Sequence, residues 1–284
     1  MDNAHTEELI HIKGPEGVRL AGAVFRPSGG DIEPAGITWV HGAWDNFYVP
    51  TLVHLSRTLA RCGYLSVTGN NRGHDLATAL HVEGRAPALG GAWWEDLEDS
   101  ADDVAAWVGC TVELGSRDVV LAGHSLGALK AIAYQAQRCD PRVRGVVLAS
   151  APSPSLLAAI VQDAELRAEA EGMVAQGRGS DLLPFGTVPS FLGTVSARTF
   201  LSLSRAAGET YDVAIARLHC PLFAFYGTEE AHIGTRDDLE AIQRLARAAP
   251  RVDIAMIQGA DHHYRGHRDE VAIQVARWIQ EIAQ

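Results

Sequence analysis

The chain has 284 residues, a hydrophobic content of 47% and a formal net charge of −11. This length and composition suit one large globular domain or two smaller ones with a sizeable core. The acidic balance, with Lys13 and Lys130 as the only lysines, argues against nucleic acid or an anionic membrane surface as the main partner.

Cysteine spacing and the composition of the N-terminus indicate whether the protein has disulfides, a metal site or a secretion signal. Cys62, Cys110, Cys139 and Cys220 are far apart and include no C-x-x-C pair, which predicts buried free thiols in place of disulfides or a metal site. The first residues are acidic and polar, unlike a signal peptide, and no window reaches the ~18 apolar residues of a membrane span. We therefore expect a cytoplasmic protein without metal, cofactor or membrane attachment.

Taken in chain order, the first segments predict a hairpin, and strands and helices then alternate. Residues 8–13 and 18–25 flank a turn and are expected to be the two hairpin strands. The later predicted strands are short, continuous apolar runs at 36–40, 64–68, 119–122, 143–149, 221–226 and 252–257. Helical periodicity is found at 48–61, 95–108, the segment after Ser125, 235–248 and 268–283.

Continuous apolar strands that alternate with helices are typical of a mostly parallel sheet covered on both faces. The alternation stops at residue 151 and resumes near 218, and between them 155–171 and 197–207 are the best helical segments. We therefore expect one α/β core formed by residues 1–150 and 218–284, with an inserted helical cap at 151–217. Residues 76–95 lack a clear period and are expected to form a long loop, which in a compact domain is usually functional.

The sequence Gly123-His124-Ser125-Leu126-Gly127 joins an apolar strand to a helix. A Gly-x-Ser-x-Gly pattern in this context is typical of a nucleophile elbow, where the serine lies on a tight, strained turn. The helix that follows directs its first N–H groups toward the serine, where negative charge would develop. The alternative is a glycine-rich structural turn. A base, an acid and an oxyanion hole elsewhere in the chain would decide between the two.

Polar residues also follow other predicted strands. These positions are candidates because open α/β sheets place their ligand-binding and active sites at the carboxyl ends of strands. His41 and Gly42 follow one strand, so the N–H groups of Ala43 and Leu126 could be the two oxyanion donors. His41 could instead only fix its loop by hydrogen bonds.

The candidate acid and base follow the last two predicted strands. Glu230, three residues after Gly227, is the favoured acid, and one imidazole of the sequence Asp261-His262-His263 could take the proton of the serine hydroxyl. His262 is favoured over His263. The rival acids are Glu229, Asp237 and Asp238.

These four ordered motifs resemble those of the α/β-hydrolase family, in which nucleophile, acid and histidine follow one another in this order. The resemblance spans roughly residues 18–284 apart from the cap. It implies the α/β-hydrolase fold, with Ser125 as nucleophile, His262 as general base and then acid, and Glu230 as the orienting carboxylate. It also implies that Ala43 and Leu126 donate to the oxyanion. Most relatives have aspartate where this chain has Glu230. The serine separates the chain from the dehalogenases and epoxide hydrolases of this fold, which use an aspartate nucleophile.

The fold by itself does not name a substrate. Apolar residues of the cap could line a pocket over Ser125 or form the cap's own core; they are Leu156, Leu157, Ile160, Phe185, Phe191, Leu192, Phe200 and Leu201. Trp44 is the aromatic residue best placed to touch substrate, and Arg72 could bind an anionic group. The candidate pocket residues are His41, Trp44, Arg72, Trp93, Trp94 and His124.

We expect a serine hydrolase whose partner is a small molecule, a mainly apolar carboxylic ester or thioester. One alternative is a thioesterase or acyltransferase of a biosynthetic pathway. Another is a non-hydrolytic binding protein on the same scaffold. The sequence does not indicate an oligomeric state.

Overall fold

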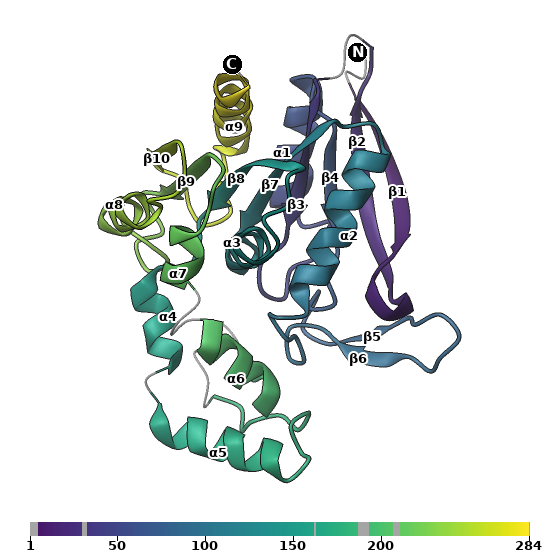
Figure 1. Ribbon diagram of the computed structural model, residues 1–284, viewed down its shortest axis with the longest axis vertical. Coiled ribbons are helices and arrows are strands. Elements are labelled where there is room, and N and C mark those ends of the chain that lie inside the picture. The colour runs from purple at the N-terminus through teal and green to yellow at the C-terminus, as the bar shows by residue number, and fades with distance from the viewer. Residues whose placement is uncertain (1–4, 30–32, 162, 187–192, 207–210, 284) are drawn as a thin grey trace.

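The computed structural model describes residues 5–29, 33–161, 163–186, 193–206 and 211–283. Within these residues, eight strands form one sheet in the order β1-β2-β4-β3-β7-β8-β9-β10 (Figure 1). β1 (His5–Lys13) and β2 (Arg19–Pro27) form the predicted N-terminal hairpin, and β2 also pairs antiparallel with β4. All later neighbours are parallel. The prediction of a mostly parallel sheet is confirmed.

The parallel strands are buried on both faces because successive residues point to opposite sides. Val119 and Leu121 pack with α2 and α3, whereas Val120 and Ala122 pack with α1 and α9. The parallel strands are β3 (Ala35–Val40), β4 (Ser66–Gly69), β7 (Asp118–His124), β8 (Val143–Ala149), β9 (Leu222–Gly227) and β10 (Val252–Ile257). The covering helices are α1 (Pro50–Arg61), α2 (Ser100–Glu113), α3 (Leu126–Arg138), α8 (Arg236–Leu245) and α9 (Arg268–Ile282).

Residues 76–95 differ from the predicted loop. β5 (Thr78–Leu80) and β6 (Ala88–Gly90) form a small antiparallel hairpin. Strands this short give no detectable alternation, so the sequence did not reveal them.

The prediction of four buried thiols is also wrong: all four cysteines are free, but Cys139 is exposed at the end of α3 and Cys62 is only half-buried.

Helices dominate the described part of the segment predicted as a cap. The predicted helix 155–171 is divided into α4 (Pro154–Val161) and α5 (Ala164–Ala175), and the Asp163 side chain caps α5 by accepting from the Leu166 N–H. α6 (Ala197–Arg205) begins at a similar serine cap. The short helix α7 (Tyr211–Ala216) was not predicted, because six residues are too few to show a period.

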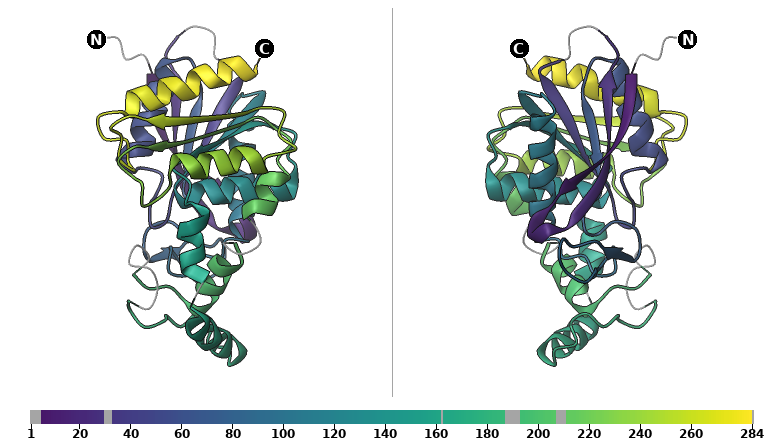
Figure 2. Two further views of the ribbon diagram at one scale, coloured as in Figure 1. Left: turned by 90° about the vertical axis from the view of Figure 1, so that its left-hand side faces the viewer. Right: turned by 90° about the vertical axis from the view of Figure 1, so that its right-hand side faces the viewer.

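α4, α5 and α6 extend from the carboxyl edge of the sheet, and the start of β1 and the end of α9 lie at the opposite end of the molecule (Figures 1 and 2). α7 instead packs against α3 and α8. One continuous cluster of buried side chains connects the sheet to Leu157, Met173 and Phe200 in these helices. The division into a core and an inserted cap stays a prediction.

Within the described residues, no helix is both long and apolar enough to span a membrane.

Candidate active site

Ser125 lies on a strained turn between β7 and α3. Its φ of 55° and ψ of −129° belong to a region that costs a residue with a side chain about 1–3 kcal/mol. The turn is tight enough that a Cβ atom at Gly123 would lie 2.2 Å from the Gly127 carbonyl oxygen. A Cβ atom at Gly127 would lie 2.2 Å from the Val40 carbonyl oxygen. The tight turn from β7 into α3 therefore requires Gly123, and the packing of β3 against the elbow requires Gly127.

Replacement of Gly127 by alanine is expected to destabilise the fold by about 3 kcal/mol, because backbone must move to admit the methyl group. The melting temperature should fall by roughly 6–12 °C in a chain of this size. Gly172→Ala is the matched control, since no atom lies within 4 Å of its added Cβ in helix α5. The control should gain up to ~1 kcal/mol. Similar thermal shifts in both variants would contradict the close-packing explanation.

Glu230, which follows β9, and His262, which follows β10, form a hydrogen-bonded pair. The Glu230 carboxylate is fully buried, and its Oε2 lies 2.7 Å from His262 Nδ1. Its other oxygen accepts from the Ser150 hydroxyl at 2.6 Å and from the Gly227 N–H. A carboxylate with these donors remains ionised and can only accept from the imidazole. His262 therefore carries its proton on Nδ1 and leaves Nε2 as the basic nitrogen.

The rival acids and the rival base lie in other surroundings. Glu229 and Asp237 are exposed, and Asp238 bonds to Thr235 at the start of α8. The His263 side chain is half-buried, and burial, followed by the nearby His262, lowers its pKa.

His41 is fully buried beneath the candidate oxyanion loop. Its Nε2 accepts from the Asn71 N–H at 3.0 Å, so its Nδ1 is protonated and donates to the Gly42 carbonyl at 2.9 Å. Burial holds the pKa of His41 well below its usual range. This neutral imidazole fixes the backbone just before Ala43 and does not reach the cavity over Ser125.

A cavity of about 320 Å³ lies over Ser125 and includes His262 in its wall. Both candidate oxyanion residues, Ala43 and Leu126, line it. Leu157 and Leu203 belong to α4 and α6, so the helices beyond the sheet edge supply part of the apolar wall. The remaining residues around the cavity are Trp44, Asp45, Pro152, Leu156, His232, Ile233 and His263.

Several candidate pocket residues lie outside this cavity. The Arg72 guanidinium is held by Asp103, with Nε 3.0 Å from Oδ1, and lines a different cavity together with Trp94. Trp93 packs against the main core, and His124 is fully buried behind the serine.

Of the apolar residues expected from the cap, some line the cavity over Ser125 and others lie elsewhere. Leu156 and Leu157 reach the cavity, whereas Phe200 is buried in the core and Phe185 is exposed. Leu201 packs against the core and is not among the cavity residues. Phe191, Leu192 and the Ile160 side chain lie outside the described part of the structure.

Asp45 and His232 line the cavity but were not singled out from the sequence. The available signal for Asp45 was a charged residue shortly after the predicted strand end at Val40. A polar residue in such a loop usually faces solvent, so the sequence alone gave no reason to choose it.

Comparison with known proteins decides the family. A family model described as the alpha/beta hydrolase family matches residues 39–275. The chain belongs to the alpha/beta hydrolase family. No curated protein matches it.

Solved structures share the fold of this alpha/beta hydrolase at low sequence identity. Est1E from Butyrivibrio proteoclasticus, with bound ferulic acid, is 15% identical with a TM-score of 0.69, over 97% of this chain and 100% of that chain. A thermostable carboxyl esterase from Bacillus coagulans is 12% identical with a TM-score of 0.72, over 98% of this chain and 99% of that chain. The esterase Pf2001 from Pyrococcus furiosus is 16% identical with a TM-score of 0.62, over 99% of this chain and 94% of that chain.

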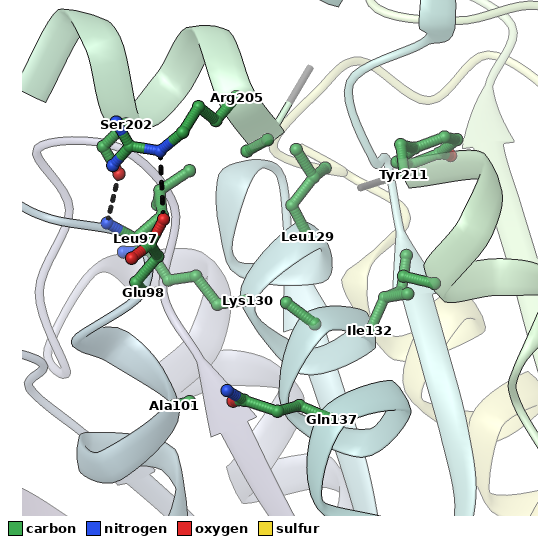
Figure 3. Close-up of a pocket in the computed structure, with 13 residues that line it drawn as sticks. Leu97, Glu98, Ala101, Leu129, Lys130, Ile132, Gln137, Ser202, Arg205 and Tyr211 are labelled. Carbon is green, nitrogen blue, oxygen red and sulfur yellow. Dashed lines mark hydrogen bonds and ion pairs between the residues drawn. The ribbon is translucent and has the colours of Figure 1, made fainter. Parts of the chain in front are cut away.

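A second cavity of this alpha/beta hydrolase, about 280 Å³, lies between α2, α3, α6 and α7 (Figure 3). Its walls are mainly apolar, and the ion pair between Arg205 Nε and Glu98 Oε1, 3.0 Å long, lies on one side. Ser125, Glu230 and His262 are not among its lining residues.

A buried ion pair connects α3 of this hydrolase to the segment before α2. Lys130 Nζ lies 2.6 Å from Glu95 Oε1, and the two side chains are 0% and 5% exposed. Lys130→Met would leave the Glu95 charge buried without its partner, so we expect a loss of about 3–5 kcal/mol in the free energy of unfolding. The double variant Lys130→Met/Glu95→Leu should recover most of this loss. Urea denaturation measures the free energy of unfolding of the single and the double variant. Equal destabilisation of the two would contradict the electrostatic explanation.

Proposed function

We propose that the protein is a serine hydrolase that cleaves a carboxylic ester through an acyl-enzyme on Ser125. The observation that carries the proposal is the hydrogen bond from His262 to the buried Glu230 carboxylate, because His262 lines the same cavity as the strained Ser125. An imidazole oriented by a buried carboxylate beside a serine is the arrangement that activates a hydroxyl for attack on a carbonyl.

In the first half of the reaction, the Ser125 oxygen attacks the ester carbonyl carbon while His262 Nε2 takes its proton. The N–H groups of Ala43 and Leu126 donate to the oxygen that becomes negative. The tetrahedral intermediate expels the alcohol, which takes the proton from His262 and leaves the acyl group on Ser125.

In the second half, His262 takes a proton from water as the water oxygen attacks the acyl-enzyme. Collapse of the second tetrahedral intermediate releases the carboxylic acid, and the proton on His262 returns to the Ser125 oxygen. Glu230 remains ionised throughout and stabilises the imidazolium that forms in each step.

The cavity supports a substrate with an apolar part of small to medium size. Its apolar wall comes from the oxyanion loop, from the start of α3 and from the helices beyond the sheet edge. The esterases among the structural neighbours are consistent with this reaction. A mainly apolar wall binds an acyl chain or ring by excluding water from it.

A series of p-nitrophenyl esters with acyl chains of increasing length tests the proposal, with Ser125→Ala protein as the blank. We expect turnover of short and medium chains above the blank. Matched thioesters, with and without an acceptor alcohol, measure thioester cleavage and acyl transfer in the same assay. If no ester or thioester is turned over above the blank, the protein is not a serine hydrolase of acyl groups, and a binding function on this scaffold becomes the better explanation.

A further inference from the structure

Asp45 places a carboxylate in the cavity beside the proposed nucleophile. It follows β3 in the same loop as Ala43, and its side chain is 16% exposed. Its Oδ2 lies 3.1 Å from the point that a Cβ atom on Gly42 would occupy, and the Ser125 Cβ lies 3.0 Å from the same point. The carboxylate and the serine therefore border the same small space.

Within the described residues, no lysine or arginine forms an ion pair with Asp45. The nearest ionisable nitrogen is His124 Nδ1, 3.9 Å from Asp45 Oδ2. His124 Nε2 donates to the His262 carbonyl at 2.7 Å. Burial, followed by the charge of nearby His262, holds the pKa of His124 well below its usual range. His124 is therefore neutral and does not balance the charge of Asp45.

The other charged groups around Asp45 have partners of their own. The Lys130 ammonium is paired with Glu95 at 2.6 Å, and Asp75 is paired with His74 at 2.8 Å. Burial raises the pKa of Asp45 to about 6, against the opposing effects of His262, Lys130 and a hydrogen bond from Gly42. At neutral pH the cavity therefore contains a carboxylate without a matching cation.

We propose that Asp45 makes the cavity selective for esters that carry a cationic group, such as a quaternary or primary ammonium, close to the ester bond. The inference rests on the proposed ester hydrolysis at Ser125. A buried charge without a partner is unfavourable, and a substrate cation in the same space supplies that partner. Trp44, the preceding residue, also lines this cavity, and aromatic rings attract cations. A substrate carboxylate would meet a like charge there.

Two esters of nearly the same shape test this selectivity. Butyrylcholine carries a quaternary ammonium, and 3,3-dimethylbutyl butyrate has a carbon atom in place of the nitrogen. We expect wild-type kcat/KM to be on the order of 10-fold higher for the cationic ester, mainly through KM. In Asp45→Asn this ratio should fall to about one, and any effect common to both esters cancels in the ratio.

Glu98→Gln is the matched control, because it changes the net charge equally at an exposed carboxylate outside this cavity. The control should keep the wild-type ratio. In the wild type the ratio should also fall as the pH is lowered through about 6 and Asp45 becomes protonated. The Asp45→Asn protein should show no such pH dependence of the ratio.

Calorimetric binding of the two esters to Ser125→Ala protein measures the preference without turnover, so it remains decisive even if the proposed hydrolysis fails. Tighter binding of the cation that disappears in Ser125→Ala/Asp45→Asn supports the inference. It is overturned if the neutral ester is bound or cleaved as well as the cation, or if Asp45→Asn keeps the preference. Loss of the preference in Glu98→Gln would place the cation in the cavity between α2, α3, α6 and α7 and would also overturn it.

Discussion

Replacement of Ser125 by alanine is expected to reduce ester hydrolysis by about 10⁴- to 10⁶-fold, because the proposed acyl-enzyme forms on its hydroxyl oxygen. The backbone at position 125 has a positive φ, which alanine tolerates about as well as serine, so the melting temperature should change little. Rates with p-nitrophenyl butyrate measure the loss.

Ser155→Ala is the control for this variant. Ser155 is an exposed serine at the start of α4, near the cavity but not among the residues around it. Its activity should remain within about twofold of wild type. If both alanine variants retain the same activity, Ser125 is not the nucleophile.

Replacement of Glu230 by glutamine is expected to reduce kcat by about 10⁴-fold while the fold is retained. The Gly227 N–H and the Ser150 hydroxyl both donate to one oxygen of Glu230. These donors would hold the glutamine oxygen and turn its NH₂ group toward His262 Nδ1. Two donors cannot share a hydrogen bond, so the imidazole would carry its proton on Nε2 and could not accept one from the serine.

Glu229→Gln is the matched control, since this neighbouring carboxylate is exposed and, in the described part of the structure, the acid hydrogen-bonded to His262 is Glu230. We expect its kcat to be unchanged within about twofold. Circular dichroism and thermal unfolding of both variants separate a chemical loss from a folding defect. A well-folded Glu230→Gln protein with near wild-type kcat would show that another group orients the base.

The features that could be predicted are those that produce a recognisable pattern within a short stretch of sequence. Strands such as β7 and β8 are continuous apolar runs because both sheet faces are covered, and this burial is visible in composition. Gly123 and Gly127 are visible because close backbone contacts admit no side chain. Glu230 was chosen because it follows a strand end, and the structure brings it to His262.

The features that could not be predicted depend on tertiary contacts between distant segments. Arg72 stands after a strand end like the other candidates, but Asp103 of α2 holds its side chain away from the cavity. Trp94 likewise donates to the Ser180 carbonyl. Asp45 looks like an ordinary loop residue in the sequence, and its burial depends on the way the loop after β3 folds against the elbow.

Labelling with a fluorophosphonate, followed by peptide mass spectrometry, tests the central claim most directly. An activated serine attacks the phosphorus and keeps the phosphonyl group as a stable adduct after fluoride leaves. We expect stoichiometric labelling of the peptide that contains Ser125, with loss of esterase activity in proportion, and no labelling of Ser125→Ala or of unfolded protein. An unlabelled native protein, or a label on another residue, would contradict the assignment of Ser125 as the nucleophile.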